Sequence, residues 1–174
     1  TISRRTLLRN VSLLATGAVA GPRGFAADLA GTRKVRKGRI KQSASKWCYK
    51  DIPLDELCAA GAQLGLRGID LLGPDAFPTL QEHGLVCTMT SGGGDLIIKE
   101  KHDAAVARIH RAIEANAAYG FPNVIAMAGY RKDMPDDEEG LKNAVIGLKR
   151  VASLAEQKQV TVCIEYLNSK VNHP

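Results

Sequence analysis

Residues 122–168 read PNVIAMAGYRKDMPDDEEGLKNAVIGLKRVASLAEQKQVTVCIEYLN, and this stretch decides the fold. Residues 122–129 and 160–168 are short and apolar on both faces, as strands buried inside a parallel sheet are. Between them, residues 134–159 have the period of a helix, with acidic residues in the first turn and basic residues later, which suits the helix dipole. The stretch therefore predicts a strand, a helix and a second, parallel strand.

The same alternation continues toward the N-terminus. Strands are expected over 40–49, 66–74 and 85–91, and helices over 51–65, 75–84 and 101–120, the last one capped by Gly120. Two architectures fit such a series, a doubly wound open sheet and a (β/α)8 TIM barrel. No GxGxxG motif follows the first strand, so the dinucleotide-binding open sheet lacks its main signature.

We expect an α/β fold that is an incomplete TIM barrel, because a whole barrel typically takes ~250 residues. About five βα units are visible in the sequence, and they run over residues 40–174. These residues would form the N-terminal part of the barrel.

Residues 1–39 differ from the rest of the chain in charge, with nine Lys or Arg and one acid. SRRTLLRN places Arg4 and Arg5 before the apolar stretch VSLLATGAVAG, and small residues follow. This order resembles a twin-arginine export signal with a basic linker, and its apolar run is too short to span a bilayer. The alternative is an amphipathic N-terminal helix. We expect the export machinery as a partner of this leader and a periplasmic location.

Residues 40–174 hold fifteen Lys or Arg and seventeen acids, so the positive net charge belongs to the leader. No basic stripe with interleaved aromatic residues appears in this part, and we expect no nucleic-acid partner. The four cysteines form no CxxC pair. Cys87 and Cys163 lie inside apolar strands and are predicted to be buried thiols.

Parallel α/β proteins bind their ligands at the carboxyl ends of the strands, so the last residues of each strand are candidates for a site. Glu165 is the strongest candidate, because burial of a carboxylate within an apolar strand costs free energy unless the carboxylate is paired, hydrogen-bonded or bound to metal. Strand alternation puts Glu165 on the face of Cys163 and opposite to Ile164. The alternative is an exposed strand end at which a Lys or Arg holds Glu165.

Three segments, LRGIDLLGP (66–74), NVIAMAG (123–129) and above all CIEYLNSKVNHP (163–174), resemble the hydroxypyruvate isomerase branch of the xylose isomerase-like sugar isomerase/epimerase barrels. The resemblance implies a (β/α)8 barrel with a divalent metal ion, Mn²⁺ or Mg²⁺. It makes Glu165 a metal ligand and one of two acid/base carboxylates. The other ligands and the second carboxylate would come from later strands, beyond Pro174.

The resemblance also implies a reaction and a set of substrate contacts. The metal polarises a carbonyl of a small sugar or hydroxy acid, and a carboxylate moves the neighbouring proton through an enediolate. Asn168 and His173 would bind substrate oxygens, and Trp47 would form an apolar wall. Without these roles, Asn168 caps a loop, His173 faces solvent and Trp47 is a core residue.

Further residues near the strand ends carry weaker expectations. Asp70 either supports a metal ligand or forms a salt bridge at the end of its strand. The glycine run SGGG at 91–94 lies where many relatives have a His, and it either lets substrate approach the backbone or forms a flexible loop. His83, His102 and His110 fall on predicted helices and are expected at the surface.

Three other functions compete with a metal-dependent isomerase, for which these 174 residues alone would be inactive. A non-catalytic exported barrel would bind a sugar without metal dependence. A polyol dehydratase of the same superfamily would share the metal and Glu165. Metal-dependent phosphodiester hydrolysis would need a basic groove and histidines at the strand ends, and the sequence shows neither.

Overall fold

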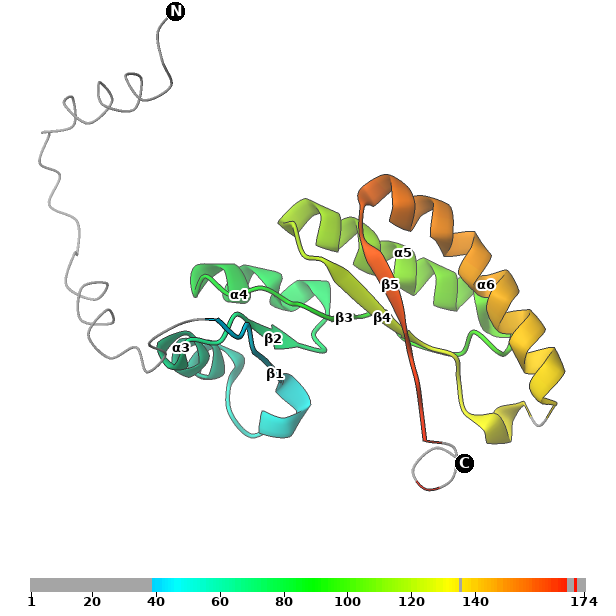
Figure 1. The fold of residues 1–174 in the computed structure, drawn as a ribbon, viewed down its shortest axis with the longest axis horizontal. Helices are drawn as coiled ribbons and strands as arrows, with labels where there is room; N and C mark the ends of the chain where they lie inside the picture. Colours follow the sequence, from blue (N-terminus) through cyan, green and yellow to red (C-terminus); the bar gives the residue numbers. More distant parts are fainter. Residues whose placement is uncertain (1–38, 135, 169–170, 172–174) are drawn as a thin grey trace, which may run out of the picture. The chain divides into compact units, whose positions relative to one another are not determined.

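The structure of the protein is a computed structural model that describes residues 39–134, 136–168 and 171 (Figure 1). The export signal expected within residues 1–39 lies, apart from Arg39, outside these described residues, and so does His173. Both predictions therefore stay predictions.

Helices and strands alternate along the described chain as the sequence predicts. The strands are β1 (Ser43–Ser45), β2 (Gly68–Asp70), β3 (Thr90–Ser91), β4 (Asn123–Met127) and β5 (Thr161–Glu165). The α-helices are α3 (Leu54–Leu64), α4 (Phe77–Glu82), α5 (His102–Tyr119) and α6 (Asp137–Lys158). Short 3-10 turns are η2 (Lys46–Tyr49), η3 (Pro74–Ala76), η4 (Lys99–Lys101) and η5 (Arg131–Asp133).

All strand pairs are parallel, and the strands follow one another in sequence order. One sheet pairs β1 with β2, and a second has the order β3-β4-β5. A bridge between Gly68 and Val86, and a 2.9 Å hydrogen bond from Leu71 N to Met89 O, link β2 to the segment that leads into β3. This uninterrupted order is the one that a barrel needs, whereas a doubly wound sheet reverses its strand order.

The helices pack on one face of these strands (Figure 1). One apolar core lies between α5, α6 and the β3-β4-β5 sheet, and a second lies between α3, α4 and the first two strands. Three aromatic rings contact one another edge-on or tilted in the second core, with centroids 4.7 to 5.6 Å apart: Phe77, Tyr119 and Phe121. Such aromatic packing couples α4 to the end of α5.

Helix ends follow the signals in the sequence. Gly120 caps α5 with a left-handed φ of 69°, as predicted. The acidic first turn of α6 is confirmed, and it is capped by Asp136, whose carboxylate accepts hydrogen bonds from Glu138 N at 2.9 Å and Glu139 N at 3.1 Å. These caps fix where α5 ends and where α6 begins.

The first three strands are shorter than predicted. Residues 46–49 form η2 instead of continuing β1, only Gly68–Asp70 of the second run is a strand, and only Thr90–Ser91 of the third apolar run is paired as a strand. The apolar pattern marks residues that are buried, but the length of a strand depends on how far its neighbour pairs with it.

The cysteine prediction is half correct. Cys87 is fully buried, and this burial raises the pKa of its thiol. Cys163 is only half-buried, because it lies on the face of β5 opposite to Val162, the residue that packs against the helices. The prediction of a buried thiol is therefore wrong for Cys163.

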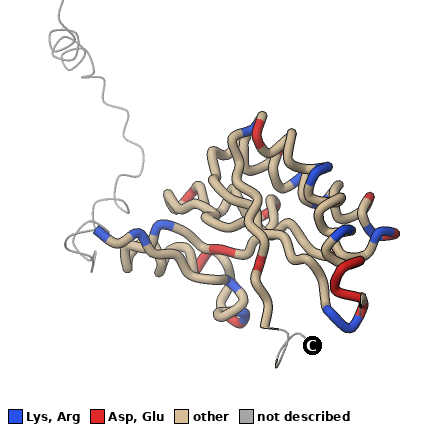
Figure 2. The backbone as a smooth tube through the Cα atoms, turned by 45° about the vertical axis from the view of Figure 1, so that its right-hand side comes forward, with Lys and Arg blue, Asp and Glu red and all other residues tan. Residues whose placement is uncertain are grey.

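The charges of the described chain are mixed. Figure 2 shows basic and acidic positions interspersed along the backbone, with acids gathered at the start of α6. Among the described helices, none is long and apolar enough to cross a membrane.

Candidate functional site

Glu165 is the last residue of β5, and its Cα is the register partner of Met127 at the end of β4. Ile164, its neighbour, lines a groove with α6, so alternation turns Glu165 toward the face opposite the helices. The Glu165 residue is exposed, and within the described residues no ion pair holds its carboxylate. The alternative of a Glu fixed by Lys or Arg finds no support in this part of the chain.

Asn168 follows Glu165 in the segment after β5. Its side-chain oxygen accepts a hydrogen bond from Val171 N at 3.3 Å, so Asn168 does cap the turn that follows the strand. An asparagine side chain also carries an amide NH₂ group, which is a hydrogen-bond donor. The substrate role of Asn168 stays a prediction.

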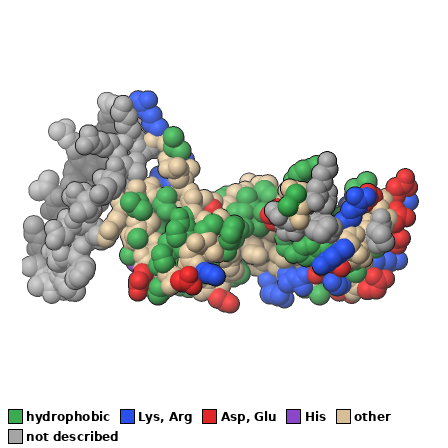
Figure 3. All heavy atoms as spheres, turned by 90° about the horizontal axis from the view of Figure 1, so that it is seen from below, with side chains coloured by type: hydrophobic (Ala, Val, Ile, Leu, Met, Phe, Trp, Pro, Cys, Tyr) green, Lys and Arg blue, Asp and Glu red, His purple; other side chains and the backbone are tan. Residues whose placement is uncertain are grey.

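Trp47 lies in η2, directly after β1, and 68% of its surface is exposed. The alternative of a core tryptophan is therefore wrong. An exposed tryptophan at the carboxyl end of a strand is placed where a substrate wall would be needed, and this role stays a prediction. Figure 3 shows the molecule from the side toward which β5 ends, and apolar side chains are exposed on that side.

Asp70, the last residue of β2, is 8% exposed and is held by hydrogen bonds. Its Oδ1 accepts from Thr88 N at 2.8 Å, from Thr88 Oγ1 at 2.6 Å and from Met89 N at 3.2 Å, and its Oδ2 accepts from Ser43 Oγ. No salt bridge to Asp70 occurs among the described residues, so that expectation is wrong. The carboxylate ties β1, β2 and the segment before β3 together.

The glycine run at 91–94 is an extension of the sheet and not a flexible loop. Gly92 N donates to Ile125 O at 2.8 Å, and Met127 N donates to Gly93 O at 2.8 Å. A Cβ at Gly92 would lie 2.6 Å from Val124 Cγ1, closer than van der Waals contact allows. Glycine is needed here because the backbone of β4 lies so close.

The histidine expectation is wrong for His102. This residue is 4% exposed at the start of α5, and its Nε2 lies 2.8 Å from Leu96 O. The other two histidines are half-buried and have polar partners. His83 Nε2 lies 2.7 Å from Asp55 Oδ1, and His110 Nε2 lies 3.2 Å from Arg150 O. A helical position alone does not reveal that the preceding loop covers the side chain.

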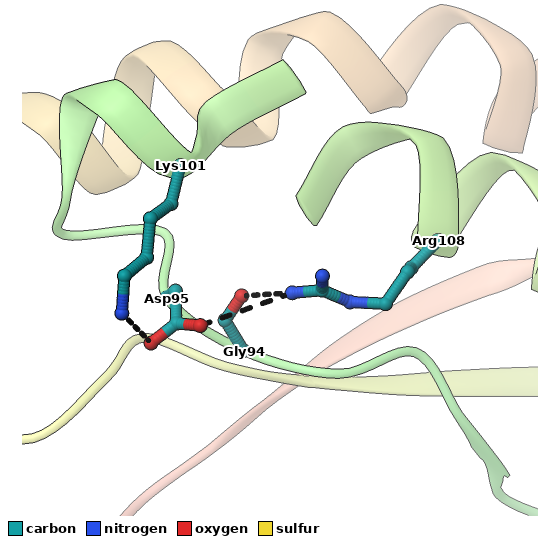
Figure 4. Close-up of polar contacts among 4 residues, drawn as sticks. All are labelled: Gly94, Asp95, Lys101 and Arg108. Atoms are coloured by element: carbon teal, nitrogen blue, oxygen red, sulfur yellow. Dashed lines mark hydrogen bonds and ion pairs between the residues drawn. The ribbon is translucent and has the colours of Figure 1, made fainter. Parts of the chain in front are cut away.

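Charged side chains also hold the connection between β3 and α5, which comprises residues 92–101 (Figure 4). Lys101 Nζ lies 3.3 Å from Asp95 Oδ1, and Arg108 Nη2 donates to Gly94 O at 3.1 Å while lying 3.9 Å from Asp95 Oδ2. These contacts lie at the carboxyl end of β3, next to the end of β4.

A divalent cation such as Mn²⁺ or Mg²⁺ needs several oxygen or imidazole ligands. Within the described residues, no three His, Cys, Asp or Glu side chains come together as such a site. Glu165 offers an exposed carboxylate that carries no ion pair in the described chain. The described residues do not make up a complete metal site, and the role of Glu165 as a ligand stays a prediction.

Residues 59–174 match the family of xylose isomerase-like TIM barrels. The chain belongs to this family. Solved structures share the fold: D-psicose 3-epimerase has a TM-score of 0.58 at 17% identity, over 77% of this chain and 55% of its own. Mannonate dehydratase from Streptococcus suis serotype 2 has a TM-score of 0.52 at 17% identity, over 72% of this chain and 53% of its own.

A third similar structure is the probable 3-DHS dehydratase from Bacillus anthracis, with a TM-score of 0.56 and 15% identity over 72% of this chain and 52% of its own. At such identities the likeness shows the fold. No curated protein matches the chain in sequence. The chain thus spans about half the length of these barrels, and the prediction of a partial TIM barrel with about five βα units is confirmed.

Proposed function

We propose that this chain contributes the first strands of a metal-dependent isomerase or epimerase that moves a carbonyl in a small sugar or hydroxy acid, as in the hydroxypyruvate isomerase branch. The observation that carries the proposal is the position of Glu165 at the carboxyl end of β5, where it is exposed and strand alternation turns it away from the helices. The xylose isomerase-like family and the similarity to a psicose epimerase support the reaction class.

In this proposal Glu165 has two tasks, as a ligand of Mn²⁺ or Mg²⁺ and as the base that takes the proton next to the substrate carbonyl. When bound, such a metal would supply Lewis-acid polarisation of that carbonyl. Asn168 donates its side-chain amide to a substrate oxygen, His173 binds another, and Trp47 forms an apolar wall. The other ligands and the second carboxylate come from barrel strands that the chain does not contain.

The test is the activity of the full-length protein with Mn²⁺ on hydroxypyruvate and a panel of ketoses, compared with Glu165→Gln. General-base catalysis is typically worth ~10²–10⁴-fold, so we expect kcat to fall by at least about 10²-fold in this variant. Glu156→Gln, at an exposed position of α6, is the matched control and keeps the wild-type rate. An active wild type with an equally active Glu165→Gln variant would show that Glu165 is not the base.

The same panel separates the competing functions. Dehydration of a polyol or sugar acid, the activity in the names of two similar structures, would give a product that has lost water. A non-catalytic barrel would bind a sugar in calorimetry with equal affinity after removal of the metal.

We further propose that the leader exports the protein through the twin-arginine pathway, with its metal loaded before export. The paired Arg4 and Arg5 before an apolar stretch support this. A reporter fused to residues 1–39 is expected in the periplasm, and Arg4→Lys combined with Arg5→Lys should keep it in the cytoplasm. Unchanged export of the double variant would contradict the proposal.

A further inference from the structure

Two buried polar side chains, one on α5 and one on α6, hold the connection between β3 and α5 from the helix side of the sheet. His102 Nε2 lies 2.8 Å from Leu96 O, and because a carbonyl oxygen only accepts, the ring nitrogen donates. Asn143 Nδ2, on α6, donates to Ile97 O at 3.0 Å. Both residues are buried, and both direct a side-chain hydrogen bond to a backbone carbonyl in this connection.

The packing around these hydrogen bonds is close. Leu96 is fully buried in the core between α5, α6 and the sheet. Helix α6 carries Gly147 opposite it, where a Cβ would lie 3.0 Å from Leu96 Cδ2 and 3.5 Å from His102 Nε2. The small residue lets α6 approach, so helix and connection form one packed unit.

The same connection pairs with the carboxyl end of β4. Ile97 N donates to Ala128 O at 2.9 Å, and Met127 N donates to Gly93 O at 2.8 Å. Met127 is in turn the register partner of Glu165. A continuous set of hydrogen bonds and strand pairing thus leads from the two helices through the connection to the carboxylate of the proposed site.

We propose that His102 and Asn143 are positioning residues, which fix residues 94–97 and thereby the end of β4 and the place of Glu165. The consequence for catalysis rests on the function proposed above, and the structural part does not. Misplacement of a reacting group by 1 Å costs about 10²-fold in rate, so a rigid connection at this edge matters for the base. His102 and Asn143 lie on the helix side of the sheet and act through the hydrogen bond from Ile97 to Ala128, next to the end of β4.

The chain offers a matched control in Asn116. It is buried on α5, and its Nδ2 donates to Asn123 O at 2.9 Å. Asn123 is the first residue of β4, so this is the same kind of hydrogen bond at the opposite end of the same strand. Asn116→Ala and Asn143→Ala therefore remove equivalent hydrogen bonds, but only the hydrogen bond of Asn143 is made to the connection between β3 and α5.

The first readout is amide hydrogen exchange in the full-length protein. In Asn143→Ala, we expect exchange at Ile97 and Met127 to rise by about tenfold or more, as loss of a buried hydrogen bond opens a region locally. Asn116→Ala should leave both amides at their wild-type rates. His102→Ala should behave like Asn143→Ala, and His102→Gln, whose amide can still donate, should restore part of the protection. Equal exchange at Ile97 and Met127 in the two Asn variants would overturn the proposal.

The second readout is steady-state kinetics on the substrate found for the wild type. Asn143→Ala should lower kcat by about 10- to 10²-fold with little change in KM, and Asn116→Ala should leave kcat unchanged. Faster exchange at Met127 without a change in kcat would overturn the catalytic part. A wild type without metal-dependent activity would contradict the proposed function instead, and the exchange result would still decide whether His102 and Asn143 fix the connection.

Discussion

Gly92 shows at the residue scale how tightly the end of β3 packs against β4. A Cβ there would lie 2.6 Å from Val124 Cγ1 and 2.8 Å from Ile125 O. We expect Gly92→Ala to lower the free energy of unfolding by about 1–3 kcal/mol, because a strand or a side chain must shift. Gly73→Ala is the control, since nothing lies within 4 Å of its Cβ position. Urea denaturation measures both, and equal stability of the two variants would contradict the close approach.

Single residues differ in how far the sequence alone could predict them. Glu165 could be found because a carboxylate in an apolar strand violates the local pattern. His102 could not, since its partner Leu96 O lies in the irregular connection before α5 and the helix pattern around His102 resembles that of a surface position. Asp70 was recognised as a strand-end carboxylate, but its partners, the hydroxyl of Thr88 and nearby amides, become visible only when the strands are paired.

Helix α6 illustrates the element scale, because its start depends on one side chain. Asp136 accepts from two backbone amides, Glu138 N and Glu139 N. Loss of an N-cap typically costs ~1 kcal/mol, so Asp136→Ala should lower the free energy of unfolding by about that amount. Asp136→Asn should keep most of the stability of the wild type, because asparagine is also a good N-cap. Asp133→Ala, at an exposed position of η5, serves as the control. Thermal or urea unfolding that ranks Asp133→Ala as the more damaging change would contradict the cap.

The elements themselves were largely predictable. All five predicted strands and the helices between them occur in the expected order, because apolar periodicity and capping residues are local signals. Strand lengths were not predictable to the same degree, since η2 cuts the first strand short after Ser45. The glycine run at 91–94 has the composition of a flexible loop, yet β4 and Arg108 hold it in place.

At the scale of the whole molecule, β5 ends the described sheet beside an apolar groove on α6. Ile164 is 45% exposed and lines this groove with Leu148 and Val162, and within the described residues β5 pairs on one side only. Exposed edge strands with apolar surface promote association. We expect the 174-residue chain to self-associate with rising concentration in sedimentation experiments, and Ile164→Lys to reduce this. Leu64→Lys, which replaces an exposed leucine on α3, should not, and equal effects of both would contradict the role of the groove.

In the proposed function Glu165 removes a proton next to the substrate carbonyl, and solvent deuterium incorporation tests this role most directly. The full-length protein with Mn²⁺ is incubated in D₂O with its substrate, and the label at the carbon beside the carbonyl is followed by NMR. We predict rapid incorporation with wild type and Glu156→Gln, and a rate at least about 10²-fold lower with Glu165→Gln. Incorporation by Glu165→Gln at the wild-type rate would contradict the assignment.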